Sequence, residues 1–370
     1  MIGKVIFISV LVLVLQHIFT VVHFFGVLTT VYTHYPGECR QIPGIDIGAE
    51  DFHTLKNGLT FITTGFRFQE HSAEAEKYFK EANRKGRMYL FDFNHPEKNV
   101  VELILTSTKV FNRETFSPHG LSAWEDKKTK RVFLFVVSHR HGQGDSIEKF
   151  LYVADKQRLH HVKTYEGSDS FKFLNDVAAT GENSFYFTNY LCWTSRPLMM
   201  VQYFFLIRCS DVVYYDGSTY QSVSGRLGGA NGISLSNDGK FVYVSAVFEK
   251  EIKVYKRETN GALTLAQSWS FGTAVDNMAV HPETGDVYCA AHPIPYKFLE
   301  HDDNPRVKRS PSQVLQLKVK GDNLTSVQEL FVDATGDLIS GSSTALVYKN
   351  KLLIGSVLHK LVLCDVNIPL

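Results

Sequence analysis

The stretch NDVAATGENSFYFTN, residues 175–189, opens on two adjacent polar side chains, Asn175 and Asp176. An apolar run, a polar turn around Gly181 and a second apolar run follow, which is the pattern of a β-hairpin. The same order of segments recurs along the chain, and the other copies begin at Glu50, His119, Asn231, Asp276 and Ser343. Most of the chain therefore consists of similar strand pairs, each opened by a polar residue.

The spacing of these copies predicts the architecture. They begin 45 to 69 residues apart, which suits four-stranded blades of roughly 40–50 residues with insertions. We therefore predict an all-β fold, a six-bladed β-propeller over residues 39–370. Only residues 72–85 and 194–208 have a helical pattern. The net charge of +1, without a basic stripe, argues against nucleic acid as a partner.

The N-terminal segment differs from the rest of the chain. Residues 5–25 contain no Asp, Glu, Lys or Arg and have about the 20 residues that cross a bilayer. We predict an uncleaved signal anchor over residues 1–30 and a juxtamembrane linker over residues 31–38; a cleaved signal peptide is the alternative. Lys4 and the amino terminus are the only charges before the segment, so the N-terminus is expected in the cytosol.

This topology makes the protein a single-pass membrane protein whose C-terminal domain is luminal or extracellular, in the endoplasmic reticulum or at the plasma membrane. The triplet NLT at Asn323 is a candidate N-glycosylation site there. Of the five cysteines, Cys39 and Cys364 lie near the two ends of the expected propeller. A bridge between them would join the ends of one closed domain, and an oxidising compartment would preserve it. The alternative is that all five thiols are free and buried.

The polar openings also predict a site. In a propeller the innermost strand of each blade begins at the central channel, so the openings should converge there. Carboxylates and amides without a cysteine cluster form the oxygen cage that Ca²⁺ prefers. Neighbouring side chains in a strand point in opposite directions, so the pairs Glu50/Asp51 and Asn175/Asp176 could each serve two different ions. The alternative is that these groups only cap strand ends in a water-lined channel.

At these residues the chain resembles the serum paraoxonase/arylesterase family of calcium-dependent lactonases. The resemblance runs from about Cys39 to Cys364. The segments that carry it include GAEDFHTLKNGL (48–59), FSPHGLSAW (116–124), FLNDVAA (173–179) and VDNMAVHPETGDVY (275–288). The fold of that family is a six-bladed propeller, in agreement with the repeat count.

The resemblance implies two calcium ions. The residues implied for the catalytic calcium are Glu50, Asn175, Asn231, Asp276 and Asn277, and those for a structural calcium are Asp51, Asp176 and the backbone carbonyl of Leu121. It also implies a catalytic histidine pair, His119 and His139, and the disulfide Cys39–Cys364. His141 is an alternative to His139.

A calcium ion at a channel mouth can polarise an ester carbonyl, while a histidine takes the proton from the attacking water. The predicted function is therefore calcium-dependent hydrolysis of a small lipophilic lactone or aryl ester.

A second functional class stays open. The chain departs from the family pattern at Gly229, Tyr288 and Ala291, which we expect in the walls of the pocket. A membrane-anchored branch of the family, known from nematodes, acts as a non-enzymatic chaperone or accessory subunit of degenerin-type ion channels. The chain resembles that branch in its N-terminal anchor and in the junction VYTHYPG, residues 31–37. The alternative function is therefore a membrane chaperone with an ion-channel client.

Overall fold

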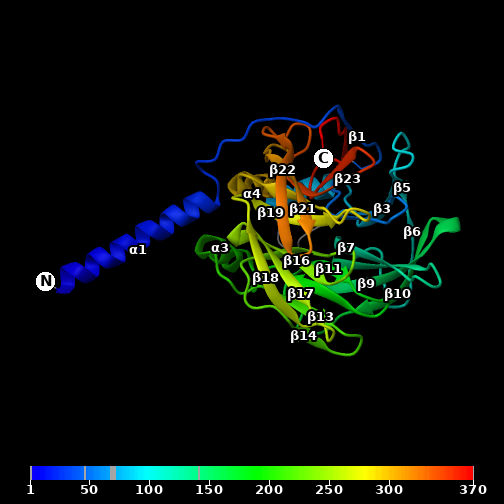
Figure 1. Cartoon of the computed structure of the whole chain (residues 1–370), viewed down its shortest axis with the longest axis horizontal. Coiled ribbons are helices and arrows are strands. Elements are labelled where there is room, and N and C mark those ends of the chain that lie inside the picture. The colour runs from blue at the N-terminus through cyan, green and yellow to red at the C-terminus, as the bar shows by residue number, and fades with distance from the viewer. Residues whose placement is uncertain (1, 46, 67–71, 141, 370) are drawn as a thin grey trace.

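Six twisted sheets surround a central axis, and one long helix projects away from them (Figure 1). The structure is a computed structural model and describes residues 2–45, 47–66, 72–140 and 142–369. Each sheet is one blade of the propeller that the sequence predicts. The innermost strands of the blades are β2, β7, β11, β15, β19 and β23, and each carries or directly follows one of the polar openings.

The first three blades follow the chain in order. Blade 1 contains β2 (Phe52–Thr54), β3 (Leu59–Thr64), β4 (Arg87–Asp92) and β5 (Val101–Glu102). Blade 2 contains β7 (Pro118–Glu125), β8 (Val132–Arg140), β9 (Gly144–Val153) and β10 (Arg158–Tyr165), with β6 (Ile104–Thr106) parallel to β10 at its outer edge. Blade 3 contains β11 (Leu174–Ala179), β12 (Phe185–Asn189), β13 (Asp211–Tyr215) and β14 (Tyr220–Ser222).

The last three blades close the ring. Blade 4 contains β15 (Ala230–Leu235), β16 (Phe241–Ala246), β17 (Glu251–Arg257) and β18 (Leu263–Ser270). Blade 5 contains β19 (Ala274–Val280), β20 (Val287–His292), β21 (Ser312–Lys320) and β22 (Asn323–Asp333). Blade 6 contains β23 (Ser342–Tyr348), β24 (Lys351–Ser356), β25 (Val362–Asp365) and, from the other end of the chain, β1 (Cys39–Gln41).

The pairing of β1 with β25 joins the two ends of the propeller. Cys39 lies directly opposite Cys364 in this antiparallel pair, and the two form a disulfide. The predicted bridge is therefore confirmed, and the alternative of five free thiols is wrong. A second disulfide, Cys192–Cys209, was not predicted, and Cys289 is a free, buried thiol.

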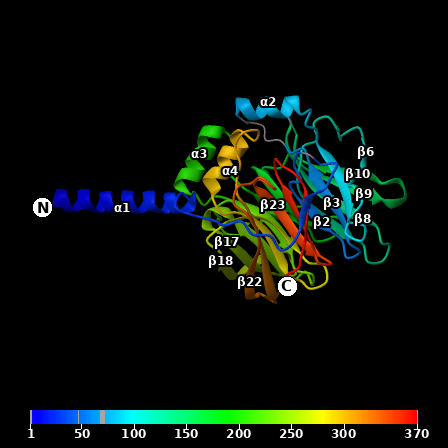
Figure 2. The ribbon, with the colours of Figure 1, turned by 90° about the horizontal axis from the view of Figure 1, so that it is seen from above.

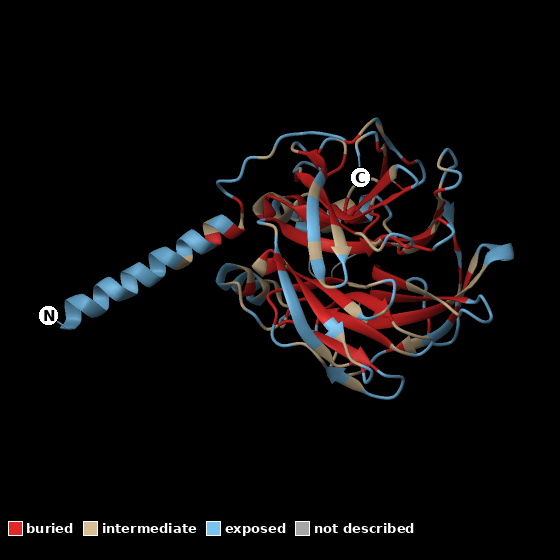
Figure 3. Ribbon diagram, in the orientation of Figure 1, coloured by how far each residue is buried: buried red, intermediate tan, exposed pale blue. Residues whose placement is uncertain are grey.

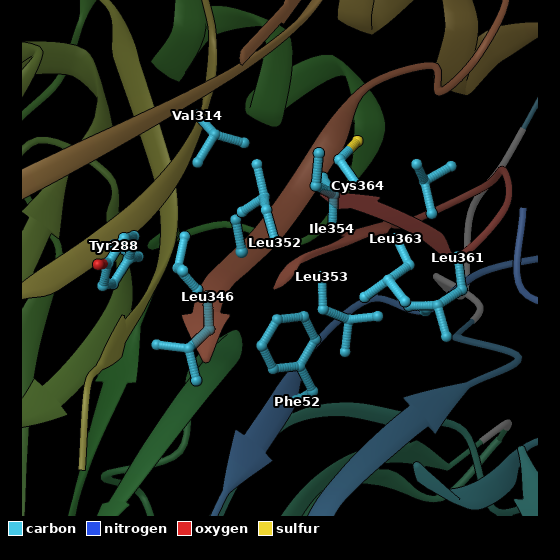
Figure 4. Close-up of a cluster of buried hydrophobic side chains, with 14 of the residues drawn as sticks. Phe52, Tyr288, Val314, Leu346, Leu352, Leu353, Ile354, Leu361, Leu363 and Cys364 are labelled. Carbon is cyan, nitrogen blue, oxygen red and sulfur yellow. The ribbon is translucent and has the colours of Figure 1, made fainter. Parts of the chain in front are cut away.

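The hydrophobic core lies between neighbouring blades. One cluster joins blade 5, blade 6 and blade 1, where Tyr288, Leu346 and Phe52 share an apolar interior (Figure 4). Four further clusters fill the interfaces of blades 1 to 5 in turn. Inner strands are therefore buried along most of their length (Figure 3), and polar residues at their beginnings are held in a rigid wall.

In the described part of the chain, four α-helices accompany the blades. They are α1 (Ile2–Phe24), α2 (Ala73–Glu81), α3 (Arg196–Phe205) and α4 (Pro295–Asp303), with short 3₁₀ turns η1 (Ala154–Lys156) and η2 (Val247–Glu249). The two predicted helices are confirmed as α2 and α3. Helix α4 was not predicted, because Pro295 at its first turn and its charged second half resemble a loop. Helices α2, α3 and α4 gather on one face of the propeller (Figure 2).

Helix α1 is long and apolar enough to cross a membrane, and most of its length is exposed (Figure 3). Its 23 residues correspond to about 35 Å at 1.5 Å per residue, more than the roughly 30 Å of a bilayer core. These properties suit a signal anchor and a signal peptide equally. The candidate glycosylation residue Asn323 is exposed at the start of β22.

Inner strands in blades 2 to 6 contain β-bulges at their channel ends. Gly120, in the bulge of β7, lies against blade 3: a Cβ there would be 2.6 Å from Asp176 Cα and 2.7 Å from Asn175 O. These are backbone atoms, which cannot move aside cheaply. The bulge therefore requires glycine at this position.

We expect Gly120→Ala to lower the free energy of unfolding by roughly 1–3 kcal/mol, the usual cost of overpacking a rigid interior. The measurement is a urea unfolding curve. Gly225→Ala is the matched control, because a Cβ at Gly225 would have no heavy atom within 4 Å. Equal midpoints for the two variants would contradict the requirement.

Candidate active site

One pocket brings together the polar openings of five blades. Its lining includes Glu50, His119, Asn175, Asn231 and Asp276. These side chains come from different blades and are only 1% to 8% exposed. The convergence that the repeat predicts is therefore present.

A second pocket, at the opposite end of the channel, is lined by Asp51, Leu121 and Asp176. Glu50 and Asp51 thus face different pockets, and so do Asn175 and Asp176. Blade 1 has a bulge at this point: the Glu50 N–H donates to Thr63 O, and the Thr63 N–H donates to Asp51 O. Two residues on one strand therefore lie opposite one residue on the next. Such bulges re-aim side chains, and here they separate each polar pair between the two ends.

Several oxygens at the first pocket lack donors. Within the described residues, Glu50 Oε2, Asn175 Oδ1, Asn231 Oδ1 and Asn277 Oδ1 are buried and have no hydrogen-bond partner. Buried polar atoms are nearly always paired. Three of these acceptors belong to the pocket lining and the fourth to Asn277 beside Glu50, so the set fits the oxygen ligands that a cation would take. Asn277 holds its place by donating from Nδ2 to Glu50 Oε1 at 2.7 Å.

The donor set fits calcium in type. No cluster of three His, Cys, Asp or Glu side chains suited to a metal occurs among the residues that the structure describes. The set instead mixes carboxylates with amides, which hard cations accept. Burial, and then the charge of Asp276, raise the pKa of Glu50 well above its usual range, against the hydrogen bond from Asn277. A divalent cation would remove that electrostatic penalty.

The second pocket has a related environment. Asp51 Oδ2 accepts the Leu121 N–H at 2.9 Å, and Asp176 Oδ2 accepts the Ile233 N–H at 2.8 Å. Burial, and then the charge of Glu50, raise the pKa of Asp51. Burial, and then the charge of Asp51, raise the pKa of Asp176. The charge of Asp51 thus opposes ionisation of Asp176, and a cation held by both carboxylates would remove this penalty.

A chain of three side chains approaches the first pocket. His119 Nδ1 is 2.9 Å from His139 Nε2, and His139 Nδ1 is 2.8 Å from Asp145 Oδ1. Asp145 Oδ2 accepts the Leu174 N–H at 2.9 Å, which fixes the carboxylate. The ring of Phe66 stacks on His119 with centroids 4.0 Å apart. The predicted histidine pair is thus in contact, and Asp145 extends it.

The two ends of the His119–His139–Asp145 series differ in charge. Burial, and then the charge of His139, lower the pKa of His119 well below its usual value. Burial opposes ionisation of Asp145, but the charge of His139 and the bonds from His139 and Leu174 outweigh it and lower the pKa of that carboxyl. At neutral pH the chain therefore has a neutral imidazole at the pocket and a carboxylate at its far end.

Sequence reasoning missed two residues of the site. Asp145 is paired with His139 in the β8–β9 hairpin. Gly142 and Gly144 mark the turn of this hairpin, and from that turn the pairing of the two residues could have been predicted. His292 Nε2 is 2.9 Å from Asp276 Oδ2. The only sequence feature that could have indicated His292 is its place at the end of the second strand of its repeat. The alternative histidine, His141, lies outside the described residues.

One expectation about the pocket walls is wrong. Gly229, Tyr288 and Ala291 are not among the described residues that line the pocket. Tyr288 and Ala291 are buried in β20, where Tyr288 joins the core between blades 5 and 6. Gly229 has a φ of +67°, a conformation that suits glycine. These departures therefore alter blade packing beside the site rather than its lining.

The sequence model of the arylesterase family matches residues 30–366. The chain belongs to the arylesterase family. It is 34% identical over 328 residues to serum paraoxonase/arylesterase 1 of Homo sapiens, covering 88% of each chain. It is 32% identical over 330 residues to serum paraoxonase/lactonase 3 of Rattus norvegicus, covering 89% of each. The family resemblance seen in the sequence is thus confirmed.

A solved luciferin-regenerating enzyme superposes with a TM-score of 0.50 at 10% identity, covering 90% of this arylesterase-family chain and all of that chain. At this identity the likeness shows the propeller fold alone.

Proposed function

We propose that this protein is a calcium-dependent hydrolase of lactones and aryl esters. The carrying observation is the His119–His139–Asp145 chain, which ends beside a buried set of partnerless oxygens in a single pocket. Family membership supports this reaction class, since the relatives are named arylesterases and lactonases.

The hydrogen bonds support His119 Nε2 as the base. An ionised Asp145 can only accept, so His139 donates from Nδ1 and, when neutral, accepts at Nε2. His119 must then donate from Nδ1 to His139. The remaining nitrogen of neutral His119, Nε2, therefore carries a lone pair on the pocket side, 3.3 Å from Glu50 Oε1. That nitrogen can take the proton of an attacking water, and Asp145 stabilises the charge through His139.

Calcium would be held by Glu50, Asn175, Asn231, Asp276 and Asn277, and when bound it would polarise the substrate carbonyl. A second calcium would be held by Asp51, Asp176 and the Leu121 carbonyl, where it would fasten blades 1, 2 and 3 together. The pocket walls are chiefly apolar and include Tyr190, Met199, Tyr203, Val247 and Phe298. A lipophilic substituent on the lactone or ester suits such walls.

We also propose that α1 anchors the protein in a membrane with the propeller on the luminal or extracellular side. Two disulfides support an oxidising compartment. Helix α3 supports the anchor: its side chains Leu198, Phe204 and Phe205 are 43% to 54% exposed. His17 of α1 stacks on Phe205 with centroids 5.4 Å apart, so this apolar face lies beside α1. Glycosylation at the exposed Asn323 would be consistent with the same orientation.

The test of function is turnover of a lactone and an aryl ester by the purified full-length chain, with calcium and with a chelator. The expected result is hydrolysis of both substrates that the chelator abolishes. The alternative of an ion-channel chaperone gains no support from relatives named as arylesterases and lactonases. A chain that binds calcium but hydrolyses neither substrate would favour it.

Calcium should also stabilise the fold. We expect a chelator to lower the melting temperature by several degrees, because a ligand that binds only the native state at 100 times its Kd contributes about 2.7 kcal/mol. Asp276→Asn removes a charge from the ion site and should reduce that difference. Asp155→Asn, at an exposed aspartate in η1, is the matched control. Superimposable melts with and without chelator would contradict the calcium proposal.

A further inference from the structure

A basic tetrapeptide lies between α4 and β21. The sequence of residues 306–309 is Arg-Val-Lys-Arg, and Pro305 and Pro311 lie on either side of residues 306–310. These residues belong to no helix or strand. Endoproteases of the subtilisin type in the secretory pathway recognise arginine at the first and fourth positions and lysine at the third. Carboxylates in their clefts pair with each of these cations.

The recognised side chains are exposed. The side chains of Arg306 and Lys308 are 54% and 51% exposed, and Val307 is 69% exposed. Arg306 forms an ion pair with Glu81 of α2, and its guanidinium lies 5.6 Å from the ring centroid of Tyr78. Surface pairs of this kind contribute little to stability, so they present only a small obstacle to a protease.

The bond after the tetrapeptide lies at the edge of the folded interior. Ser310 is buried, its N–H donates to Ser340 Oγ at 2.8 Å, and its carbonyl accepts the Gly341 N–H at 3.2 Å. Two residues earlier, His301 Nδ1 donates to Lys308 O at 2.8 Å. Cleavage therefore requires a local opening that breaks a few hydrogen bonds, an event that needs less free energy than global unfolding.

A cut at this bond would leave the two pieces joined. The disulfide Cys39–Cys364 links a residue of the first piece to a residue of the second. The strand pairs β20–β21 and β1–β25 also connect the two pieces. A cut protein would therefore keep its propeller, which is the condition for cleavage to modify the protein rather than destroy it.

The cut would also release one end of α4. Phe298 and Asp302 of this helix line the first pocket. The segment that contains the tetrapeptide connects the C-terminal end of the helix to blade 5. After cleavage, surface contacts such as the ion pair between Arg196 and Asp303 hold that end, and the chain no longer does.

We propose that the bond between Arg309 and Ser310 is a processing site for a secretory endoprotease specific for Arg-X-Lys-Arg. The product is a protein of two disulfide-linked chains in which α4 is loosened. Water adds across the peptide bond, so that Arg309 gains a carboxylate and Ser310 gains an ammonium group. The inference is independent of the proposed hydrolase activity and rests on the proposed luminal or extracellular orientation of the propeller.

The test expresses the full-length chain with a C-terminal epitope tag in cultured animal cells and compares gels run with and without reductant. Reductant should release a tagged fragment whose first residue is Ser310 by N-terminal sequencing. Without reductant, the tag should migrate at the size of the whole protein. Arg306→Ala and Arg309→Ala should each lower the amount of fragment at least tenfold, because each removes a cation that the cleft pairs with.

Two further variants control this result. Arg226→Ala changes an exposed arginine in another loop and should be cut like the wild type. Arg309→Lys covers the case in which the alanine variant does not fold, since it keeps the charge but not the guanidinium, and it should stay uncut. An intact wild-type chain under reducing conditions overturns the inference. A fragment that begins elsewhere, for example after the basic residues 127–131, also overturns it.

The orientation and the product are measured separately. Protection of the tag from added protease in sealed vesicles reports the orientation, so its failure is distinguished from the absence of a processing site. Release of the tagged fragment without reductant would contradict the two-chain product. Hydrogen exchange should be faster in residues 295–303 of the cut protein than in uncut Arg309→Lys, while residues 287–292 should be unchanged. Equal exchange in residues 295–303 would overturn the loosening of α4.

Discussion

Replacing His119 with Gln should lower turnover of lactones and aryl esters by roughly 10²–10⁴, the usual contribution of a general base. The melting temperature should hardly change. Gln is similar in size to His and polar, so the buried position stays filled and its contact with His139 can persist. It has no basic nitrogen, however, and cannot take the proton from water. The measurements are kcat on one lactone and one aryl ester, and a melt in calcium.

Two variants sharpen this result. His160→Gln is the control, since His160 is an exposed histidine in the same blade, and it should keep full activity. Asp145→Asn should lower kcat with little change in KM, because an amide can donate to His139 Nδ1 and reverse the hydrogen-bond direction along the chain. Full activity in His119→Gln would refute the base assignment. Full activity in Asp145→Asn would refute only the positioning role.

Removing the Cys39–Cys364 disulfide should be the most destabilising change outside the site. The bridge spans 325 residues, for which the chain-entropy model gives on the order of 6 kcal/mol, and native disulfides typically contribute about 2–5 kcal/mol. It also fastens β1 to β25, the one pair that joins the first and last strands of the ring. Urea unfolding of the Cys39→Ser/Cys364→Ser protein measures the loss.

The second disulfide provides the comparison. Cys192–Cys209 spans 17 residues, for which the same model gives only about 3 kcal/mol. Cys192→Ser/Cys209→Ser should therefore cost less global stability and instead loosen the segment that contains α3. A Cys39→Ser/Cys364→Ser protein as stable as the wild type would show that strand pairing alone closes the ring.

Local patterns carried most of the fold prediction. The hairpin around Gly181 forms as expected between β11 and β12, because turn residues and alternation act over a few neighbours. The convergence of the polar openings was also predictable from the sequence. A residue at the same position in every repeat lies at an equivalent place in every blade around the axis. Helix α4 was not predicted, because Pro295 and its charged second half resemble a loop. Its place is set by tertiary contacts such as the stacking of Phe298 on His292.

The sequence by itself therefore determined the number of blades and the convergence of Glu50, His119, Asn175, Asn231 and Asp276, because each follows from a repeated position. The bridge between the chain ends was implied by the family resemblance, and the structure decided it against five free thiols. Only the tertiary structure decided that Asp145 completes the histidine chain, that Cys192 pairs with Cys209, and that Phe24 reaches the pocket wall. The last contact joins residues more than 200 positions apart, such as Phe24 and Phe248. Local periodicity does not encode such contacts, because they depend on how whole blades and helices pack.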